Sequence, residues 1–217
     1  MTQPTVPPMS IDHQHAMHTA ATNLQTKFAG VFSQETIERF LTSSYDQFAT
    51  TTTVPNYLPL LAERFAGQRL TALARVEGKG ADGQPIVLFL CVHNAGRSQM
   101  AMGFFQHLAG DHAVAWSGGS EPGSEVNAAA VAAMGERGID ISTEFPKPWT
   151  EEVIRAADVV ITMGCGDACP LYPGKKYLDW ELDDPAGKSV DDIRPIRDEI
   201  ERRVRDLLAS LDLTTTT

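Results

Sequence analysis

The chain has 217 residues, enough for one or two domains with a substantial buried core. Its 28 acidic residues outnumber its 18 basic ones, and the net charge of −10 argues against a surface for nucleic acid or an anionic membrane. Without an apolar run of ~20 residues or a signal-peptide core, and with only three cysteines, the sequence predicts a protein of the reducing cytoplasm.

The N-terminal segment Met1–Ser10 is polar and rich in proline, so we expect a disordered lead. Three histidines follow closely, His13, His15 and His18, and such spacing is compatible with metal binding. Apart from Asp12, no cysteine or acidic cluster joins them. A solvated first helical turn is therefore the favoured interpretation, and no metal site is predicted.

Apolar residues at helical spacing predict three amphipathic helices between residues 11 and 79. The first ends at Gly30, the second follows an N-cap candidate at Ser33, and the third begins near Tyr57. Three such helices with short connections predict a small bundle, in which no catalytic group stands out. The residues expected to face inward are Met17, Ala21, Leu24, Phe28, Ile37, Phe40, Leu41, Tyr45, Phe48, Leu58, Leu61 and Phe65.

The segment Glu77–Pro85 is rich in glycine and charge, so it is the expected linker, with a domain boundary near residue 80. Over residues 80–217, short apolar strands alternate with helices, which predicts an α/β domain with a parallel sheet. The expected strands are Ile86–Leu90, Ala113–Trp116, Asp158–Met163 and Tyr177–Trp180, and the expected helices are Gln99–Leu108, Val126–Arg137, a short one from Thr150, and Asp191–Leu211. Between them, Ser117–Gly123 is expected to be a mobile loop.

Cys91 stands where the first buried strand, Ile86–Leu90, ends, and Arg97 and Ser98 follow directly before a helix. Ligands of open α/β sheets bind at such strand ends. Free loop N–H groups and the helix dipole there favour an anion, and they also favour a thiolate at Cys91. Arg97 adds a planar fork of donors for two oxygens of a tetrahedral oxyanion. An inert packing cysteine with a chance arginine is the alternative, but the whole pattern is hard to obtain by accident.

Two more cysteines, Cys165 and Cys169, lie in the glycine-rich segment after the third strand. If the sheet is doubly wound, this segment opens on the same edge as Cys91. The pair could also be two buried thiols or half of a zinc site, but no further ligands stand at suitable spacing. A glycine-rich loop at a solvent edge is a poor place to bury thiols, so redox chemistry is favoured.

The segment Cys91–Ala101, CVHNAGRSQMA, resembles the active-site loop of the low-molecular-weight protein tyrosine phosphatases. It resembles still more closely the loop of the arsenate reductases built on that fold. The resemblance covers about Pro85–Leu211 and implies a four-stranded parallel sheet flanked by helices, while the bundle resembles an N-terminal extension of some arsenate-reductase-like proteins. The loop residues implied to bind the oxyanion are Val92, His93, Asn94, Ala95, Gly96, Arg97 and Ser98.

The resemblance also implies roles for the three cysteines. In three-cysteine arsenate reductases a nucleophilic cysteine is followed by two resolving cysteines, so Cys91 would be the nucleophile, Cys165 would attack it, and Cys169 would attack Cys165. The spacing of the last two is shorter here than in thioredoxin-coupled members. The implied external reductant is thioredoxin, or mycothiol with mycoredoxin, and a monothiol route would make the two later cysteines dispensable.

The segment around Asp184-Pro185 matches the acid–proline signature of both families, and Asp183 precedes it. A carboxylic acid is needed there because the leaving oxygen takes up a proton as its bond breaks. Phosphatases usually continue with an aromatic residue that grips a phosphotyrosyl ring, whereas this chain has Ala186. A surface Asp-Pro turn is the alternative if the motif is taken alone.

Some relatives bind potassium through an asparagine that matches Asn94 and a glutamate whose position is Met102 here. We therefore predict no potassium site, and we expect Asn94 to hold the loop through its side-chain hydrogen bonds. The expected activity is reduction of arsenate, with phosphate or sulfate as competing oxyanions. The alternatives are a phosphatase, which needs only Cys91, Arg97 and Asp184, and a catalytically silent oxyanion sensor, which the intact set of three argues against.

Overall fold

The computed structural model describes residues 9–49, 55–80, 83–164 and 171–213. The chain divides into two compact units, Met1–Ala81 and Asp82–Thr217. That these units are two separate domains stays a prediction. Most of the predicted disordered lead, residues 1–8, lies outside the described residues, as do Cys165 and Cys169.

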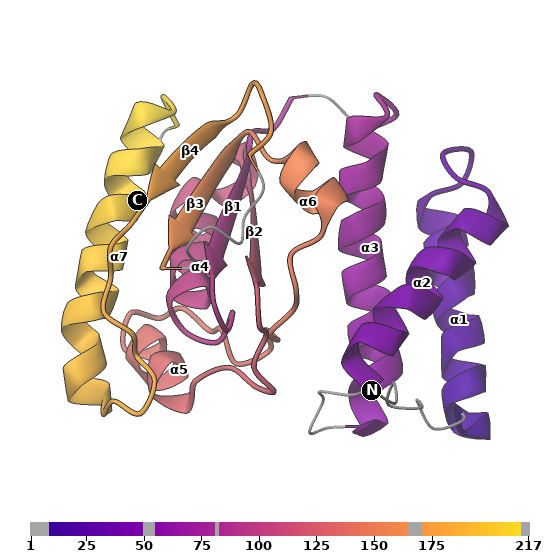
Figure 1. The fold of residues 1–217 in the computed structure, drawn as a ribbon, viewed down its shortest axis with the longest axis horizontal. Helices are drawn as coiled ribbons and strands as arrows, with labels where there is room; N and C mark the ends of the chain where they lie inside the picture. Colours follow the sequence, from indigo (N-terminus) through magenta and orange to yellow (C-terminus); the bar gives the residue numbers. More distant parts are fainter. Residues whose placement is uncertain (1–8, 50–54, 81–82, 165–170, 214–217) are drawn as a thin grey trace. The chain divides into compact units, whose positions relative to one another are not determined.

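The first unit is helical, with α1 (Ile11–Lys27), α2 (Gln34–Ala49) and α3 (Leu58–Val76), the last preceded by a 3-10 turn, η1 (Pro55–Tyr57) (Figure 1). Each α-helix contacts the other two. Ser10 is the N-cap of α1, and its side chain accepts the N–H of His13 at 3.2 Å. Apolar side chains fill the centre, and the rings of Phe48 and Phe65 meet edge to face at 5.5 Å.

The second unit is built on a four-stranded parallel sheet, as predicted, and the structure gives its strand order as β2-β1-β3-β4 (Figure 1). The strands are β1 (Ile86–Cys91), β2 (Val114–Gly119), β3 (Val159–Met163) and β4 (Lys176–Asp179). Every residue of β1 is buried, which accounts for its unbroken apolar sequence. A central strand covered on both faces is a rigid base for whatever group stands at its end.

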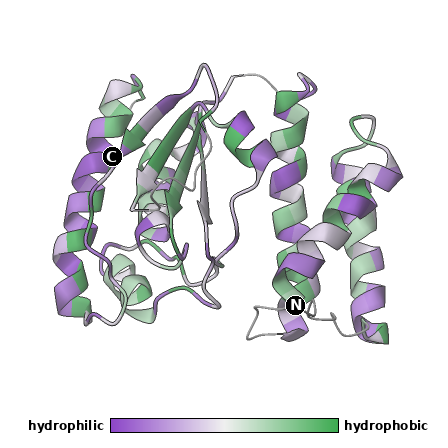
Figure 2. Cartoon of the chain, in the orientation of Figure 1, coloured by the Kyte–Doolittle hydropathy of each residue, from purple (hydrophilic) through white to green (hydrophobic). Residues whose placement is uncertain are grey.

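Helices flank this sheet: α4 (Arg97–Ala109), followed by a 3-10 turn, η2 (Gly110–His112), then α5 (Ala128–Gly135), α6 (Glu151–Ala156) and α7 (Val190–Ser210). α4 contacts β1 and β2, and α7 contacts α4 and α5. Val87, Phe89 and Cys91 of β1 share one core with these helices. Figure 2 shows the matching hydropathy, with hydrophobic residues on the strands and a mixed hydrophilic surface along α7.

The prediction of a mobile loop from Ser117 was wrong for its first three residues, because β2 continues through Gly119. Ser117, Gly118 and Gly119 pair in register with the last three residues of β1. The glycines are required by close packing: a Cβ on Gly118 would lie 3.1 Å from the backbone of Trp149, and one on Gly119 would lie 2.6 Å from the carbonyl oxygen of Val92. Glycine here marks a close backbone approach inside a strand.

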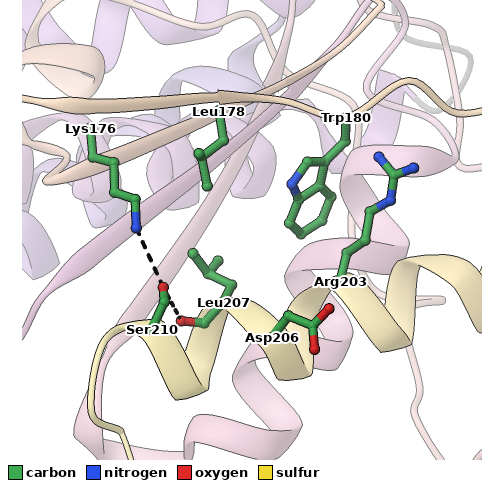
Figure 3. A pocket seen from close by; sticks show the side chains of 7 residues that line it. All are labelled: Lys176, Leu178, Trp180, Arg203, Asp206, Leu207 and Ser210. Atoms are coloured by element: carbon green, nitrogen blue, oxygen red, sulfur yellow. Dashed lines mark hydrogen bonds between the residues drawn. The ribbon is translucent and has the colours of Figure 1, made fainter.

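Among the described helices, none combines the length and the apolarity that crossing a bilayer requires. A surface pocket lies between β4 and α7 (Figure 3), where the Lys176 ammonium donates to the Ser210 hydroxyl at 3.4 Å. This pocket shares no residue with the cleft at Cys91 described below. The residues that line it are Lys176, Leu178, Trp180, Arg203, Asp206, Leu207 and Ser210.

Glu136, which follows α5, joins this helix to α7 through two arginines. Arg194 donates to both carboxylate oxygens, at 2.6 and 2.9 Å, and Arg197 donates to one of them at 2.7 Å. These hydrogen bonds, from Arg194 first and then Arg197, lower the pKa of Glu136 from its usual 4.5 to about 2. Since the folded pKa lies below the unfolded one, the network stabilises the fold above pH 4.5 and loses that contribution as the pH falls towards 2.

We expect Glu136→Gln to lower the thermal unfolding midpoint by a few degrees near neutral pH. The difference from wild type should shrink as the pH falls from 4.5 towards 2, because Glu136 then takes up a proton in the unfolded wild-type chain before it does so in the folded one. Unfolding followed by circular dichroism across this range measures both. The matched control is Glu125→Gln, an exposed glutamate of the same unit that makes no ion pair in the described part of the chain. A difference independent of pH would show that lost packing, not charge, is responsible.

Candidate active site

Cys91 is the last residue of β1, and it is paired on one side with Gly119 of β2 and on the other with Met163 of β3. It therefore stands at the centre of the sheet's carboxyl edge. Cys91 is buried, with only 2 % of its surface exposed. Next along the chain comes the oxyanion loop, residues 92–98, which leads from β1 into α4. Strand, cysteine, loop and helix thus have the arrangement predicted from the sequence.

The oxyanion loop turns its carbonyl groups outward. The carbonyls of Val92, His93 and Ala95 accept N–H groups from the segment 121–127 at 2.8–2.9 Å. Within the described residues, the N–H groups of His93 through Gly96 have no acceptor. Those of Arg97 and Ser98 belong to the first turn of α4, where no intrahelical acceptor exists. The loop is therefore a cradle of backbone donors suited to a tetrahedral anion.

Asn94 stabilises the oxyanion loop through its side-chain hydrogen bonds. Its backbone has the left-handed conformation, with φ of 47°. Its side-chain oxygen accepts the N–H of Lys147 at 2.9 Å and the amide of Gln99 at 3.2 Å, so its NH₂ group donates to the Ser98 hydroxyl at 2.8 Å. Asn94 thus has the structural role expected from the sequence. The Ser98 oxygen lies 3.0 Å from Cys91 Sγ, and because it already accepts from Asn94, its proton is free for the sulfur. Ser98 is thus placed to donate a hydrogen bond to the sulfur.

Arg97 lines the same cleft as Cys91, and its side chain is only 8 % exposed. Its Nη2 is 3.2 Å from the Asp184 carboxylate and its Nη1 donates to the carbonyl of Leu182 at 3.4 Å. A Cβ on Gly164, the residue after β3, would lie 3.1 Å from Nη1. The guanidinium is therefore held between the end of β3 and the segment that carries Asp184.

Asp184 belongs to the acid loop, residues 182–187, which closes over the oxyanion loop. One Asp184 oxygen accepts the N–H of Ala186 at 3.0 Å and the other faces Arg97. Pro185 packs directly on Gly96, where a Cβ would come within 2.5 Å of its ring. The structure thus brings Cys91, Arg97 and Asp184 together in one cleft. The cleft is lined by Cys91, His93, Ala95, Gly96, Arg97, Asn127, Asp184, Pro185 and Ala186.

We expect Gly96→Ala to reduce activity about tenfold or more, because a small misplacement of a catalytic group is costly. The added methyl would overlap Pro185 and push the acid loop away from Arg97. Gly135→Ala is the matched control, since a Cβ there meets open space. Steady-state rates of both variants test this, and a Gly96→Ala rate equal to that of the control would show that the acid loop does not need this contact.

Two residues of the site were not singled out from the sequence. Asn127 lines the cleft, and its position before an alanine-rich helix is the signal that could have found it as an N-cap. Lys147 supports Asn94 from a distant segment, and no local pattern marks it. The described residues contain no group of three or more potential metal ligands. That the protein uses no metal stays a prediction.

Two protein families match the chain. One is described as protein-tyrosine-phosphatase-like, N-terminal domain, over residues 17–74, and the other as low molecular weight phosphotyrosine protein phosphatase, over residues 86–216. The solved structure of a thioredoxin-dependent arsenate reductase from Corynebacterium glutamicum is 48 % identical, with a TM-score of 0.82, over 93 % of this chain and 98 % of that one.

Other relatives match a little more than half of this chain. Arsenate reductase 2 of Staphylococcus epidermidis is 38 % identical over 122 residues, which is 54 % of this chain and 92 % of that protein. A solved arsenate reductase in a phosphate-binding state is 36 % identical, with a TM-score of 0.52, over 58 % of this chain and 98 % of that one.

Proposed function

The chain belongs to the low molecular weight phosphotyrosine protein phosphatase family, and from this premise we propose that it is an arsenate reductase, an enzyme that converts arsenate to arsenite. The observation that carries the proposal is the position of Gly164 against Arg97. Because Cys165 follows Gly164, the chain passes directly from the oxyanion site into the segment with the two further cysteines. A phosphatase has no use for them. Ala186, in the cleft where phosphatases carry an aromatic residue, supports the same choice.

The first step forms a bond between sulfur and arsenic. Arsenate lies in the oxyanion loop, with its oxygens bound by the free N–H groups and by Arg97. The Cys91 thiolate attacks arsenic, and Asp184 donates a proton to the departing oxygen, which leaves as water. Arsenic is still pentavalent at this point and is bonded to the Cys91 sulfur as a thioarsenate ester.

The next steps transfer two electrons. The Cys165 thiolate attacks the sulfur of Cys91, a disulfide forms, the sulfur–arsenic bond breaks, and its electron pair leaves with trivalent arsenite. Cys169 then attacks Cys165, which frees Cys91 and leaves a Cys165–Cys169 disulfide. An external dithiol reduces this disulfide. We propose thioredoxin as that dithiol, with mycothiol and mycoredoxin as the alternative system.

Arsenate turnover coupled to thioredoxin and thioredoxin reductase, compared with hydrolysis of p-nitrophenyl phosphate, tests the proposal. Multiple turnovers of arsenate with little hydrolysis are expected. Efficient hydrolysis without arsenate reduction would establish the phosphatase, and the absence of both would favour an oxyanion sensor. Phosphate and sulfate should compete with arsenate, since the cradle binds any tetrahedral oxyanion. We place the enzyme in the cytoplasm, where thiols stay reduced, and propose neither nucleic acid nor membrane as a partner.

Asp184→Asn is expected to slow formation of the sulfur–arsenic bond by ~10²–10⁴-fold, the usual contribution of a general acid. Binding of arsenate or phosphate should persist, because the amide keeps the shape of the carboxyl group. Rapid-quench measurement of the first turnover, with calorimetry for binding, separates the two effects. Asp183→Asn is the matched control, since that side chain is 80 % exposed and faces Lys188 instead of Arg97. If only the control slows the reaction, Asp183 is the acid.

A further inference from the structure

Asn127, the residue before α5, is bonded to three separate elements. Its backbone N–H donates to the carbonyl of Ala95 in the oxyanion loop at 2.8 Å. Its side-chain oxygen accepts the N–H of Ala130 at 2.9 Å and so caps α5. Its side-chain NH₂ group donates to the carbonyl of Pro185 in the acid loop at 3.4 Å. One side chain therefore joins the helix to the segment that carries Asp184.

The orientation of the amide follows from these partners. Only the oxygen can accept from Ala130, so the NH₂ group must face the acid loop, where the Pro185 carbonyl is an acceptor. Aspartate would cap the helix equally well, but an ionised carboxylate has no proton to donate to Pro185. Serine has a proton, but its oxygen stands one bond nearer the backbone than the asparagine nitrogen, which itself lies 3.4 Å from the Pro185 carbonyl, so a capping serine does not reach it. The donor that reaches the acid loop is thus a property of asparagine, and capping alone does not call for it.

The Pro185 carbonyl lies at the middle of the acid loop. It also accepts the N–H of Lys188, and the same turn presents the N–H of Ala186 to the Asp184 carboxylate at 3.0 Å. The direction of the Asp184 side chain therefore depends on where the Pro185 backbone stands. Its ring rests on Gly96, an apolar contact that does not fix the direction of the carbonyl group, and the bond from Lys188 comes from within the same turn. The bond from Asn127 adds a directional restraint that ties this carbonyl to another element, α5.

We propose that Asn127 is a positioning residue that fixes the acid loop on the oxyanion loop, so that the Asp184 carboxyl group meets the leaving oxygen. The inference rests on the proposed function, because the group positioned is the acid of that reaction. Asn127 acts through Asp184, and so its loss should matter only while Asp184 can donate a proton. Removing it should leave oxyanion affinity unchanged, since the backbone donors and Arg97 remain in place.

The test is Asn127→Ser, which keeps the cap and the backbone bond to Ala95, while its shorter side chain withdraws the donor from Pro185. The first turnover of arsenate should slow about tenfold, because the Asp184 carboxyl group is then slightly misplaced. Phosphate affinity by calorimetry should stay at the wild-type value. In the Asp184→Asn background, Asn127→Ser should cause no further loss. The matched control is the reverse exchange at a remote cap, Ser10→Asn of α1, which should leave the rate unchanged.

An equal loss with and without the Asp184 carboxyl group would overturn the proposal, as would an unchanged first turnover in Asn127→Ser. Amide hydrogen exchange adds a readout without arsenate: residues 183–188 should exchange faster in Asn127→Ser than in wild type or Ser10→Asn. If the wild-type protein fails to reduce arsenate, the proposed function is wrong, and the exchange measurement still decides whether Asn127 holds the acid loop. Unchanged exchange there would reject that role.

Discussion

Cys91→Ser is expected to abolish arsenate reduction, with a loss on the order of 10⁴–10⁶-fold, as removal of an enzyme's covalent nucleophile causes elsewhere. A hydroxyl does not ionise usefully near neutral pH, even with the donor from Ser98 directed at it. Oxygen also cannot replace sulfur in the second step, because no disulfide can form at position 91. Both halves of the reaction therefore fail together.

The oxyanion loop should survive this change, because its shape depends on Asn94 and on the segment 121–127, not on the thiol. Phosphate binding by calorimetry is the control, and it should remain close to the wild-type affinity. A Cys91→Ser protein that binds phosphate and still completes repeated arsenate turnovers would show that another group is the nucleophile. Loss of both binding and turnover would point to a collapsed loop, which Cys91→Ala should then reproduce.

The second large effect concerns the two later cysteines. Cys165→Ser should stop the reaction after one chemical event, with arsenic left on Cys91, so repeated turnover with thioredoxin falls to background. Cys169→Ser should release one arsenite per protein and then retain a Cys91–Cys165 disulfide, because nothing inside the protein can resolve it. We propose this order because Cys165 follows Gly164 in the sequence, and Gly164 lies against Arg97.

Mass spectrometry of digested, alkylated protein distinguishes these two states, and counting arsenite per protein gives the stoichiometry. Both variants should keep any slow hydrolysis of p-nitrophenyl phosphate, because that reaction never uses Cys165 or Cys169. This retained activity is the internal control for an intact oxyanion site. Full multiple turnover of arsenate with thioredoxin in both variants would refute the intramolecular relay, and a low-molecular-weight thiol acting on Cys91 would then be the better account.

Much of the catalytic unit could be predicted from local patterns. β1 is buried on both faces, so its apolar run is unbroken, and the end of the strand located Cys91. Helix α4 begins at Arg97, two residues before the predicted start at Gln99, since the first turn of this helix carries the polar residues of the site. α7 lies within one residue of its predicted ends because its apolar residues recur at a strict helical period.

The rest could not be predicted because it depends on contacts between distant segments. Arg97 and Asp184 meet across 87 residues, and the acid was found through its family signature instead of any local rule. Gly118 and Gly119 of β2 were predicted to lie in a loop. They are glycines because the backbones of Trp149 and Val92 come too close for a side chain, which the local sequence does not reveal. Lys147 and Asn127 act through partners elsewhere in the chain, so their local sequence reveals at most a helix cap.

The cradle of backbone N–H groups has a consequence for selectivity. Main-chain donors recognise shape and charge, and arsenate and phosphate are alike in both, so the loop should bind the two with similar strength. Discrimination must then occur after binding. Phosphorus on Cys91 cannot accept an electron pair at biological potentials, so attack by Cys165 is productive only when arsenic is attached. The sulfur relay would act as a chemical filter, and abundant phosphate would delay the enzyme without being consumed by it.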